Sequence, residues 1–89
     1  MIKKKVKIVN KLGLHARASM KLVNLAGRYS SQIFMVLKNH KVNAKSIMNV
    51  MVLAATKGSE IELQIDGADE KEALAAIEKL IQERFGESE

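Results

Sequence analysis

The sequence contains no cysteine, no proline and no tryptophan, and aromatic residues make up only 3% of its 89 residues. Without cysteine there can be no disulfide, no CxxC redox pair and no thiolate metal site, so a reducing compartment is permitted. His15 and His40 are the only histidines, too few to bind zinc by themselves. We therefore expect neither a metal nor a cofactor.

Long apolar runs are also missing. No stretch approaches the ~20 apolar residues that span a bilayer, and no uninterrupted apolar segment follows the first lysines as it would in a signal peptide. We expect a cytoplasmic protein without membrane insertion. The length fits one domain over residues 1–89. The net charge of +5 favours an acidic partner, whether nucleic acid, anionic lipid or an acidic protein face.

Apolar periodicity and turn signals divide the chain into seven short elements. The predicted strands are residues 2–8, residues 33–37, a short strand from Val42 after a turn at residues 38–41, and residues 61–65. The predicted helices are residues 16–26, residues 47–54, and a final helix that follows Asp69 and ends at Gly86. The order β-α-β-β-α-β-α predicts an α/β (α+β) open-faced sandwich, in which a four-stranded antiparallel sheet carries three helices on one face.

The predicted helices have apolar stripes and end signals. The first stripe comprises Ala16, Met20, Val23 and Ala26, with Leu22 and Leu25 beside them, and Gly27 follows as terminator. The second comprises Ile47, Val50, Met51 and Ala54, after Ser46 as N-cap. The third runs from Ala73 to Phe85, after capping-box spacing from Asp69 to Glu72.

The most informative stretch is residues 12–19, in which His15 lies at the start of the first predicted helix. The backbone amides of a first helical turn have no partners within the helix, and with the helix dipole they favour an anion. Arg17 can add a bidentate donor to a phosphate, and the amides of Ala16 and Arg17 lie in the same turn. A neutral imidazole is a nucleophile, so these residues suit reversible capture of a phosphoryl group on His15. The same residues also suit a plain helix cap beside a solvated arginine.

Two stretches of the sequence resemble the signatures of a known family. Gly13-Leu14-His15-Ala16-Arg17 and Asn43-Ala44-Lys45-Ser46-Ile47-Met48 are similar to those of HPr, the histidine-containing phosphocarriers of the bacterial phosphoenolpyruvate-dependent phosphotransferase system. The likeness covers nearly the whole chain, and the two motifs at this spacing are strongly indicative. It implies the open-faced sandwich and a carrier that is not an enzyme in its own right. We expect a monomer, because a carrier must meet several partners in succession.

The resemblance also implies roles for single residues. His15 would accept phosphate from enzyme I on Nδ1 and pass it to enzyme II A domains, with Arg17 beside the phosphate. Ser46 would be the serine modified by an HPr kinase/phosphorylase where one exists. The positions that match the family's apolar docking surface for its partners are Ile47, Met48 and Met51.

The sequence departs from the family's pattern at three positions. Ala18 stands where many members have proline, which suits a first helical turn without being required by the chemistry. Asn49 replaces a frequent glycine near Ser46. His40 stands in a turn where glycine is common, which would cost stability if its φ angle were positive.

Two other functions remain open at this stage. A regulatory interaction domain, in which phosphorylation of His15 reports metabolic state without sugar transport, would use the same surface. A small basic nucleic-acid-binding module is prompted by the charge. Its support is weak, because Tyr29, Phe34 and Phe85 are the only aromatic residues and no strand carries a set of stacking aromatics.

Overall fold

The computed structural model of the chain describes residues 1–53 and 55–89. The strands of this part are β1 (Ile2–Lys7), β2 (Gln32–Leu37), β3 (His40–Asn43) and β4 (Glu60–Asp66). The α-helices are α1 (Ala16–Ala26), α2 (Ile47–Leu53) and α3 (Glu70–Gln82), and a short 3-10 helix, η1 (Arg84–Gly86), follows. Ala54, the last position of the predicted second stripe, lies outside the described residues.

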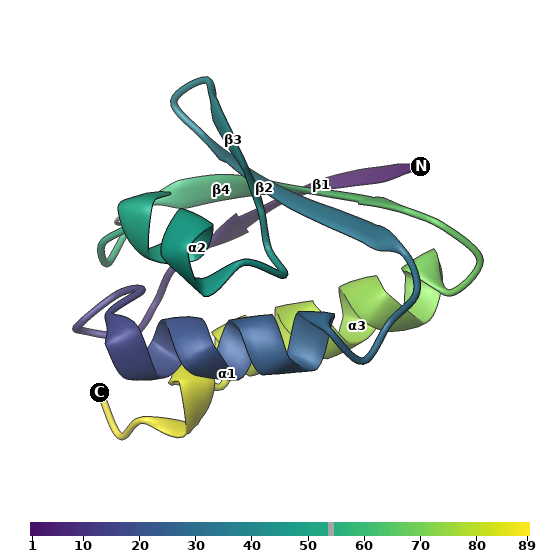
Figure 1. Ribbon diagram of the computed structural model, residues 1–89. Coiled ribbons are helices and arrows are strands. Elements are labelled where there is room, and N and C mark those ends of the chain that lie inside the picture. The colour runs from purple at the N-terminus through teal and green to yellow at the C-terminus, as the bar shows by residue number, and fades with distance from the viewer. Residues whose placement is uncertain (54) are drawn as a thin grey trace.

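The strands form one sheet in the order β1-β4-β2-β3, and every neighbouring pair is antiparallel. All three helices lie on the same side of this sheet, with α1 and α3 side by side (Figure 1). Alternation in β4 explains the layering: Ile61, Leu63 and Ile65 are buried under the helices, while Glu60 and Asp66 at its ends are exposed. The predicted open-faced sandwich is confirmed.

Lys4 lies between Ile2 and Val6 on the side of β1 that faces the helices, and the structure explains why a lysine is found there. Its Nζ lies 2.8 Å from Oε2 of Glu78 on α3, so the lysine reaches past the rim of the helical layer to a carboxylate. An inward-pointing charge on an edge strand also discourages pairing with another chain.

The apolar stripe predicted for α1 is confirmed at Ala26, which is buried, and at Val23, which packs against the core, but it is wrong at Ala16 and Met20. The residues of α1 that are buried are Ala18, Ser19, Leu22 and Ala26, whereas Ala16 is exposed and Met20 keeps 56% of its surface. Because α1 carries apolar residues around most of its circumference, spacing alone could not choose the face. Gly27 does end the helix, but with right-handed angles (φ −65°, ψ −15°), so its freedom at positive φ is not used.

The last helix ends earlier than predicted. α3 stops at Gln82, and Arg84, Phe85 and Gly86 all have positive φ angles (58°, 55° and 78°), which turn the chain sharply. Phe85 is fully buried as expected, but it reaches the core from this turn and not from the helical stripe. Burial of the ring stabilises a backbone conformation that is unfavourable for a non-glycine residue.

The predicted capping box at Asp69 is wrong. Asp69 is the N-cap residue of α3, but its carboxylate makes no cap hydrogen bond to the helix among the described residues. It accepts instead from the backbone N–H groups of Ser30 (2.9 Å) and Ser31 (3.0 Å) and from the Ser31 hydroxyl. The carboxylate thereby joins the start of α3 to the segment that enters β2.

The β2–β3 hairpin is tighter than predicted. Leu37 pairs with His40, so the loop is only Lys38 and Asn39, and β3 begins at His40 and not at Val42. The positive φ angles fall on Lys38 (48°) and Asn39 (69°), as a type I′ turn requires. The positive φ angle considered for His40 is therefore found at Lys38 and Asn39 instead.

Candidate functional site

The loop between β1 and α1 is held by the protein interior. Gly13 has φ +64°, and a Cβ on it would lie 2.4 Å from the carbonyl oxygen of Ala55. The next residue, Leu14, is buried and donates its N–H to that same oxygen at 2.8 Å. The Ser19 hydroxyl in turn donates to the Leu14 carbonyl at 3.0 Å. These contacts fix the residue that immediately precedes His15.

His15 is the N-cap residue of α1. Its backbone is extended (φ −71°, ψ 179°), and its carbonyl accepts the Ser19 N–H at 2.9 Å. Across the described residues, the imidazole makes no cap hydrogen bond to the helix, and no acidic side chain lies in the first turn. The first-turn amides are thus left for another acceptor. With 28% of its side chain exposed, the ring can be reached from solvent.

Residues 87–89 return to this site from the far end of the chain (Figure 1). The turn at Arg84–Gly86 directs them across the start of α1. Lys21 Nζ on α1 donates to the Phe85 carbonyl at 2.6 Å, and the Lys11 N–H donates to the Glu89 carbonyl at 2.8 Å. The segment is therefore anchored on either side of Glu87.

Glu87 contacts the His15 ring directly. One of its carboxylate oxygens, Oε2, is hydrogen-bonded to Nε2 of His15. The other, Oε1, accepts from Nδ2 of the buried Asn10 at 2.9 Å. The Asn10 hydrogen bond holds the pKa of Glu87 below its ordinary value despite partial desolvation, and the bond to His15, with the charge of that ring whenever it is protonated, lowers this pKa further.

An open depression of about 900 Å³ surrounds the ring. His15 and the first-turn residues Ala16 and Arg17 line it together, as predicted, and Ala16 and Arg17 are exposed. The remaining lining residues are Lys11, Leu12, Lys21, Gly86, Glu87, Ser88 and Glu89. An anion entering here meets the imidazole, the first-turn amides and three cationic side chains, and also the carboxylates of Glu87 and Glu89.

The predicted docking and regulatory residues lie on α2. Ser46 caps this helix: its Oγ is 3.5 Å from the Asn49 N–H, and its carbonyl accepts the Val50 N–H at 3.0 Å. Val50 is buried, Ile47 is half-buried, and the side chains of Met48 (69%) and Met51 (42%) are exposed.

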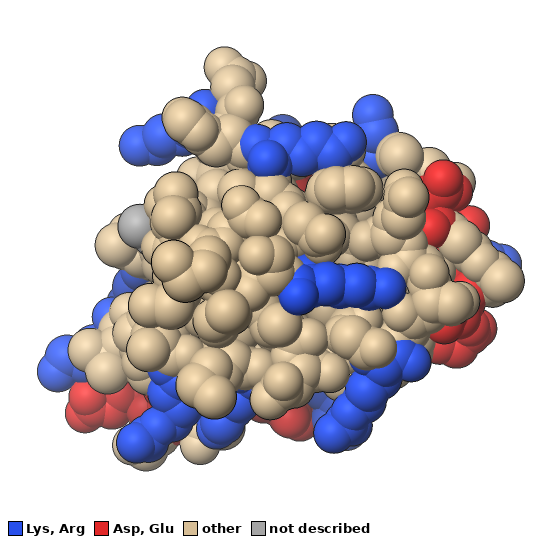
Figure 2. All heavy atoms as spheres, in the orientation of Figure 1, with Lys and Arg blue, Asp and Glu red and all other residues tan. Residues whose placement is uncertain are grey.

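The exposed methionines of α2 belong to a wider surface. Leu12, Met20 and Val52 are also large apolar side chains that remain exposed. Figure 2 shows this side of the molecule as a broad area over α1 and α2 of mostly uncharged residues, crossed by a basic side chain, and its carboxylates gather near the margins. The surface is largely apolar and has no acidic side chain at its centre in this view.

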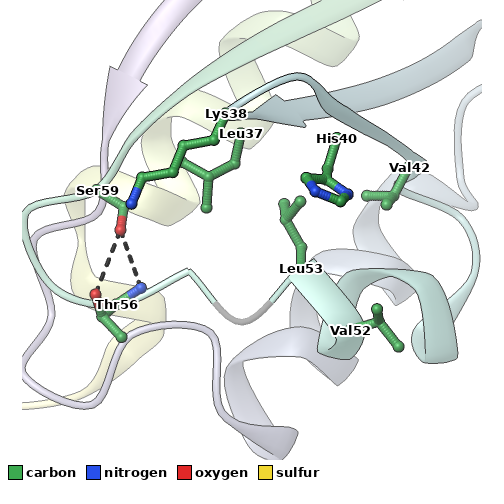
Figure 3. A pocket seen from close by; sticks show the side chains of 8 residues that line it. All are labelled: Leu37, Lys38, His40, Val42, Val52, Leu53, Thr56 and Ser59. Atoms are coloured by element: carbon green, nitrogen blue, oxygen red, sulfur yellow. Dashed lines mark hydrogen bonds between the residues drawn. The ribbon is translucent and has the colours of Figure 1, made fainter.

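A second hollow, of about 360 Å³, lies between the β2–β3 hairpin and the end of α2 (Figure 3). Leu37 and Leu53 point into it, with His40 at its side, and the Thr56 N–H donates to Ser59 Oγ at 3.1 Å across its floor. None of the predicted site residues lines it, and His40 has no carboxylate beside it there. The depression at His15 is therefore the candidate site.

Within residues 1–53 and 55–89, no group of three or more histidine, aspartate or glutamate side chains is arranged to hold a metal ion. No helix in that same part of the chain combines the length and apolar character needed to cross a bilayer.

Sequence reasoning missed Asn10 and Glu87. Asn10 lies in a segment that the sequence predicts to be a loop. Although its side chain is completely buried, no repeating apolar pattern marks it as buried. Glu87 is 72 positions from His15. The only hint was an acidic pair, Glu87 and Glu89, directly after Gly86 in a basic protein.

Comparison with known proteins reveals close relatives. Residues 2–83 match the family model described as the PTS HPr component phosphorylation site. The phosphocarrier protein HPr of Cupriavidus necator is 54% identical over 89 residues, and that of Neisseria meningitidis is 51% identical; both alignments cover 100% of both chains. The crystal structure of HPr-C-His from Thermoanaerobacter tengcongensis superposes over 100% of both chains with a TM-score of 0.96 and 44% identity.

Proposed function

The chain belongs to the HPr family of phosphocarriers of the bacterial phosphotransferase system, and we propose that it accepts a phosphoryl group on Nδ1 of His15 from enzyme I and passes it to enzyme II A domains. The protein would act in the cytoplasm as a monomeric carrier, not as an enzyme in its own right. The observation that carries the proposal is the partly exposed imidazole of His15 at the N-terminus of α1, beside first-turn amides that the ring does not cap.

The site suits temporary storage of a phosphate. A phosphohistidine or similar phosphoryl group carries ~ −1.5 to −2 charge. The amides of Ala16 and Arg17 and the guanidinium of Arg17 can share that charge. Because Arg17 is exposed, solvent and salt weaken its attraction. The phosphate is thereby held well enough to survive diffusion and weakly enough to be released.

Labelling with phosphoenolpyruvate and enzyme I tests this role. We expect an acid-labile, base-stable adduct on the protein, and no adduct on His15→Ala. His40→Ala is the matched control, since His40 is exposed and lies outside the depression. Labelling of His15→Ala, or loss of labelling in His40→Ala, would contradict the assignment.

Arg17 is tested by Arg17→Ala against Arg28→Ala. Both arginines are exposed, but Arg28 lies beyond the other end of α1. We expect slower transfer for Arg17→Ala, unchanged transfer for Arg28→Ala, and a native circular dichroism spectrum for both. Equal rates for the two variants would remove Arg17 from the site.

The apolar surface at Ile47, Met48 and Met51 is proposed as the docking face for enzyme I and the enzyme II A domains. Met48 is the most exposed of the three and has the adaptable side chain that suits several partners. Met48→Glu should weaken binding of an acidic partner, because it puts a carboxylate where the surface has none. Ala75→Glu adds the same charge to an exposed position of α3 and should leave binding intact.

Ser46 is proposed as a regulatory phosphorylation site for an HPr kinase/phosphorylase. Its hydroxyl is only partly buried and caps α2 through a long 3.5 Å contact, so a phosphate could replace it without breaking the core. The added charge would lie within the docking face and repel an acidic partner. Ser46→Asp should therefore weaken enzyme I binding at near-native stability. Unchanged transfer kinetics would count against this role.

The open face of the sheet argues against a nucleic-acid-binding function. Lys5 and Lys7 of β1 stand directly opposite Glu62 and Glu60 of β4, so their charges are offset within the sheet. Lys41 Nζ lies 4.5 Å from the centroid of Phe34, so a lysine covers that ring. Among the described strands, no other phenylalanine, tyrosine or tryptophan is present to stack on a base.

A further inference from the structure

We propose that Glu87 is a positioning residue for His15: held in place by the Asn10 amide, its carboxylate accepts the Nε2–H of the ring and so reserves the Nδ1 lone pair for the incoming phosphoryl group. The inference rests on the proposed function of His15. It extends that function to a residue at the opposite end of the sequence.

The orientation of the Asn10 side chain is the first step. Asn10 is completely buried, and its Nδ2 donates to the Gly13 carbonyl at 2.9 Å and to Glu87 Oε1 at 2.9 Å. Both hydrogens of the amide are thus used. If the amide group were rotated by 180°, Oδ1 would face two other acceptor oxygens, the Gly13 carbonyl and Glu87 Oε1. The Gly13 carbonyl therefore determines that the NH₂ group of Asn10 faces Glu87.

The position of the Glu87 backbone is the second step. The buried Phe85 ring and the Lys21–Phe85 hydrogen bond hold the chain just before it. The Lys11 N–H holds the Glu89 carbonyl just after it. The carboxylate therefore reaches the ring from an ordered segment, and little additional ordering is needed to form its contact with His15.

The state of the ring follows. An ionised carboxylate can only accept hydrogen bonds, and its bond from Asn10 lowers the pKa of Glu87, which keeps it ionised at neutral pH. Its partner, Nε2 of His15, must then carry the hydrogen. In a neutral imidazole only one nitrogen is protonated, so Nδ1 keeps its lone pair.

The transfer step balances without a proton leaving the ring. The Nδ1 lone pair forms the N–P bond while the bond between phosphorus and the donor breaks, and the electron pair of that bond stays with the donor. The ring gains positive charge, and its Nε2–H remains bonded to the Glu87 carboxylate, which offsets that charge. In the reverse step the same ring is the leaving group and needs no new proton.

The direct test reads the tautomer of His15 by ¹⁵N chemical shifts of the imidazole, at alkaline pH where free imidazoles are neutral. In the native chain we expect the hydrogen on Nε2. In Glu87→Gln, Asn10 still requires an acceptor and takes the amide oxygen. The amide NH₂ group then faces the ring and favours the form with hydrogen on Nδ1. Glu87→Ala removes the acceptor and should give a mixture of the two forms.

The molecule offers two controls for this measurement. Glu83→Gln neutralises an exposed carboxylate ahead of the same turn and should leave the His15 tautomer unchanged. His40, exposed on β3, should give the same signals in every variant. A Glu87→Gln spectrum identical to the native one, or an equal change in Glu83→Gln, would overturn the proposal.

The functional readout is the initial rate of phosphoryl acceptance. Carboxylates that orient metal-bound histidines are typically worth about 10- to 100-fold in activity. By analogy, we expect Glu87→Gln to be slower by a factor of that order at an unchanged urea midpoint. Native acceptance by Glu87→Gln despite a shifted tautomer would overturn the positioning role. If the native chain accepted no phosphate, the proposed function would fail, and the ¹⁵N measurement would still decide whether Glu87 sets the tautomer.

Discussion

Replacing Gly13 by alanine should displace the candidate site, and the structure supplies a matched control. At Gly13 (φ +64°) the new Cβ would lie 2.4 Å from the Ala55 carbonyl oxygen and 2.9 Å from Cα of Thr56. At Gly58 (φ +89°) a new Cβ would meet nothing within 4 Å among the described residues. Both substitutions put alanine at positive φ, but only the first meets the backbone.

The two effects have different sizes. Left-handed backbone costs a non-glycine residue about 1–2 kcal/mol, partly offset by about 0.4–1 kcal/mol because alanine restricts the unfolded chain. Gly58→Ala should therefore lose at most about 1.5 kcal/mol. Overpacking adds about 1–3 kcal/mol, so Gly13→Ala should exceed its control by that amount. This is a large share of the ~4–13 kcal/mol expected for a domain of this size.

Urea unfolding of the two variants measures the difference, and the rate of phosphoryl acceptance measures its effect on the site. The Ala55 oxygen that meets the new Cβ also binds the Leu14 N–H. Relief of the clash must therefore move the residue before His15. A displacement of about 1 Å can cost about 100-fold in rate. Equal stability losses in Gly13→Ala and Gly58→Ala, or native acceptance by Gly13→Ala, would refute this reasoning.

Three further predictions concern the fold. Ile77→Ala should lower the free energy of unfolding by about 2–5 kcal/mol, because Ile77 is fully buried. Ile77→Asp should prevent folding, because it would bury an unpaired charge. A loss below about 1 kcal/mol for Ile77→Ala in a urea titration would contradict the packing. The Ser31 hydroxyl and the Ser30 and Ser31 amides lower the pKa of Asp69 from 3.8 to about 2, so its stabilisation is complete above pH 3.8 and is lost as pH falls through about 2. Urea midpoints measured across this range should fall more steeply for the native chain than for Asp69→Asn. Replacing Lys38-Asn39 by Asn-Gly should raise stability by about 1 kcal/mol, because both positions have positive φ; a lower thermal midpoint would show that the turn is not of type I′.

Local periodicity was enough to predict the element order, the sheet and the residues that flank His15. These features depend on neighbours in sequence: the alternation of Ile61, Leu63 and Ile65, or the glycine and histidine at the start of a helix. The apolar face of α1 was less well determined, because Met20 is as apolar as the buried Leu22. Which of them packs inward depends on where α3 and the sheet lie.

The errors share a physical cause, which is competition from distant groups. Asp69 has the right spacing for a capping box, but two serines nearly forty positions away bind its carboxylate. Phe85 has the right spacing for a helical stripe, yet burial of its ring stabilises a turn. Contact of Glu87 with His15 depends on that turn, so no local pattern could have indicated it.

The return of residues 87–89 to His15 decides how the protein should be handled. An affinity tag joined after Glu89 would begin beside the His15 ring. Its residues could disturb the hydrogen bonds by which Lys11 and Asn10 hold residues 87–89 in place. Met1 lies at the other end of the molecule (Figure 1), where its amino group makes ion pairs with Asp66 and Glu70, away from the His15 ring. Purification handles, fluorophores and immobilisation linkers therefore belong before Met1, and rates measured with a fusion after Glu89 would describe a different site.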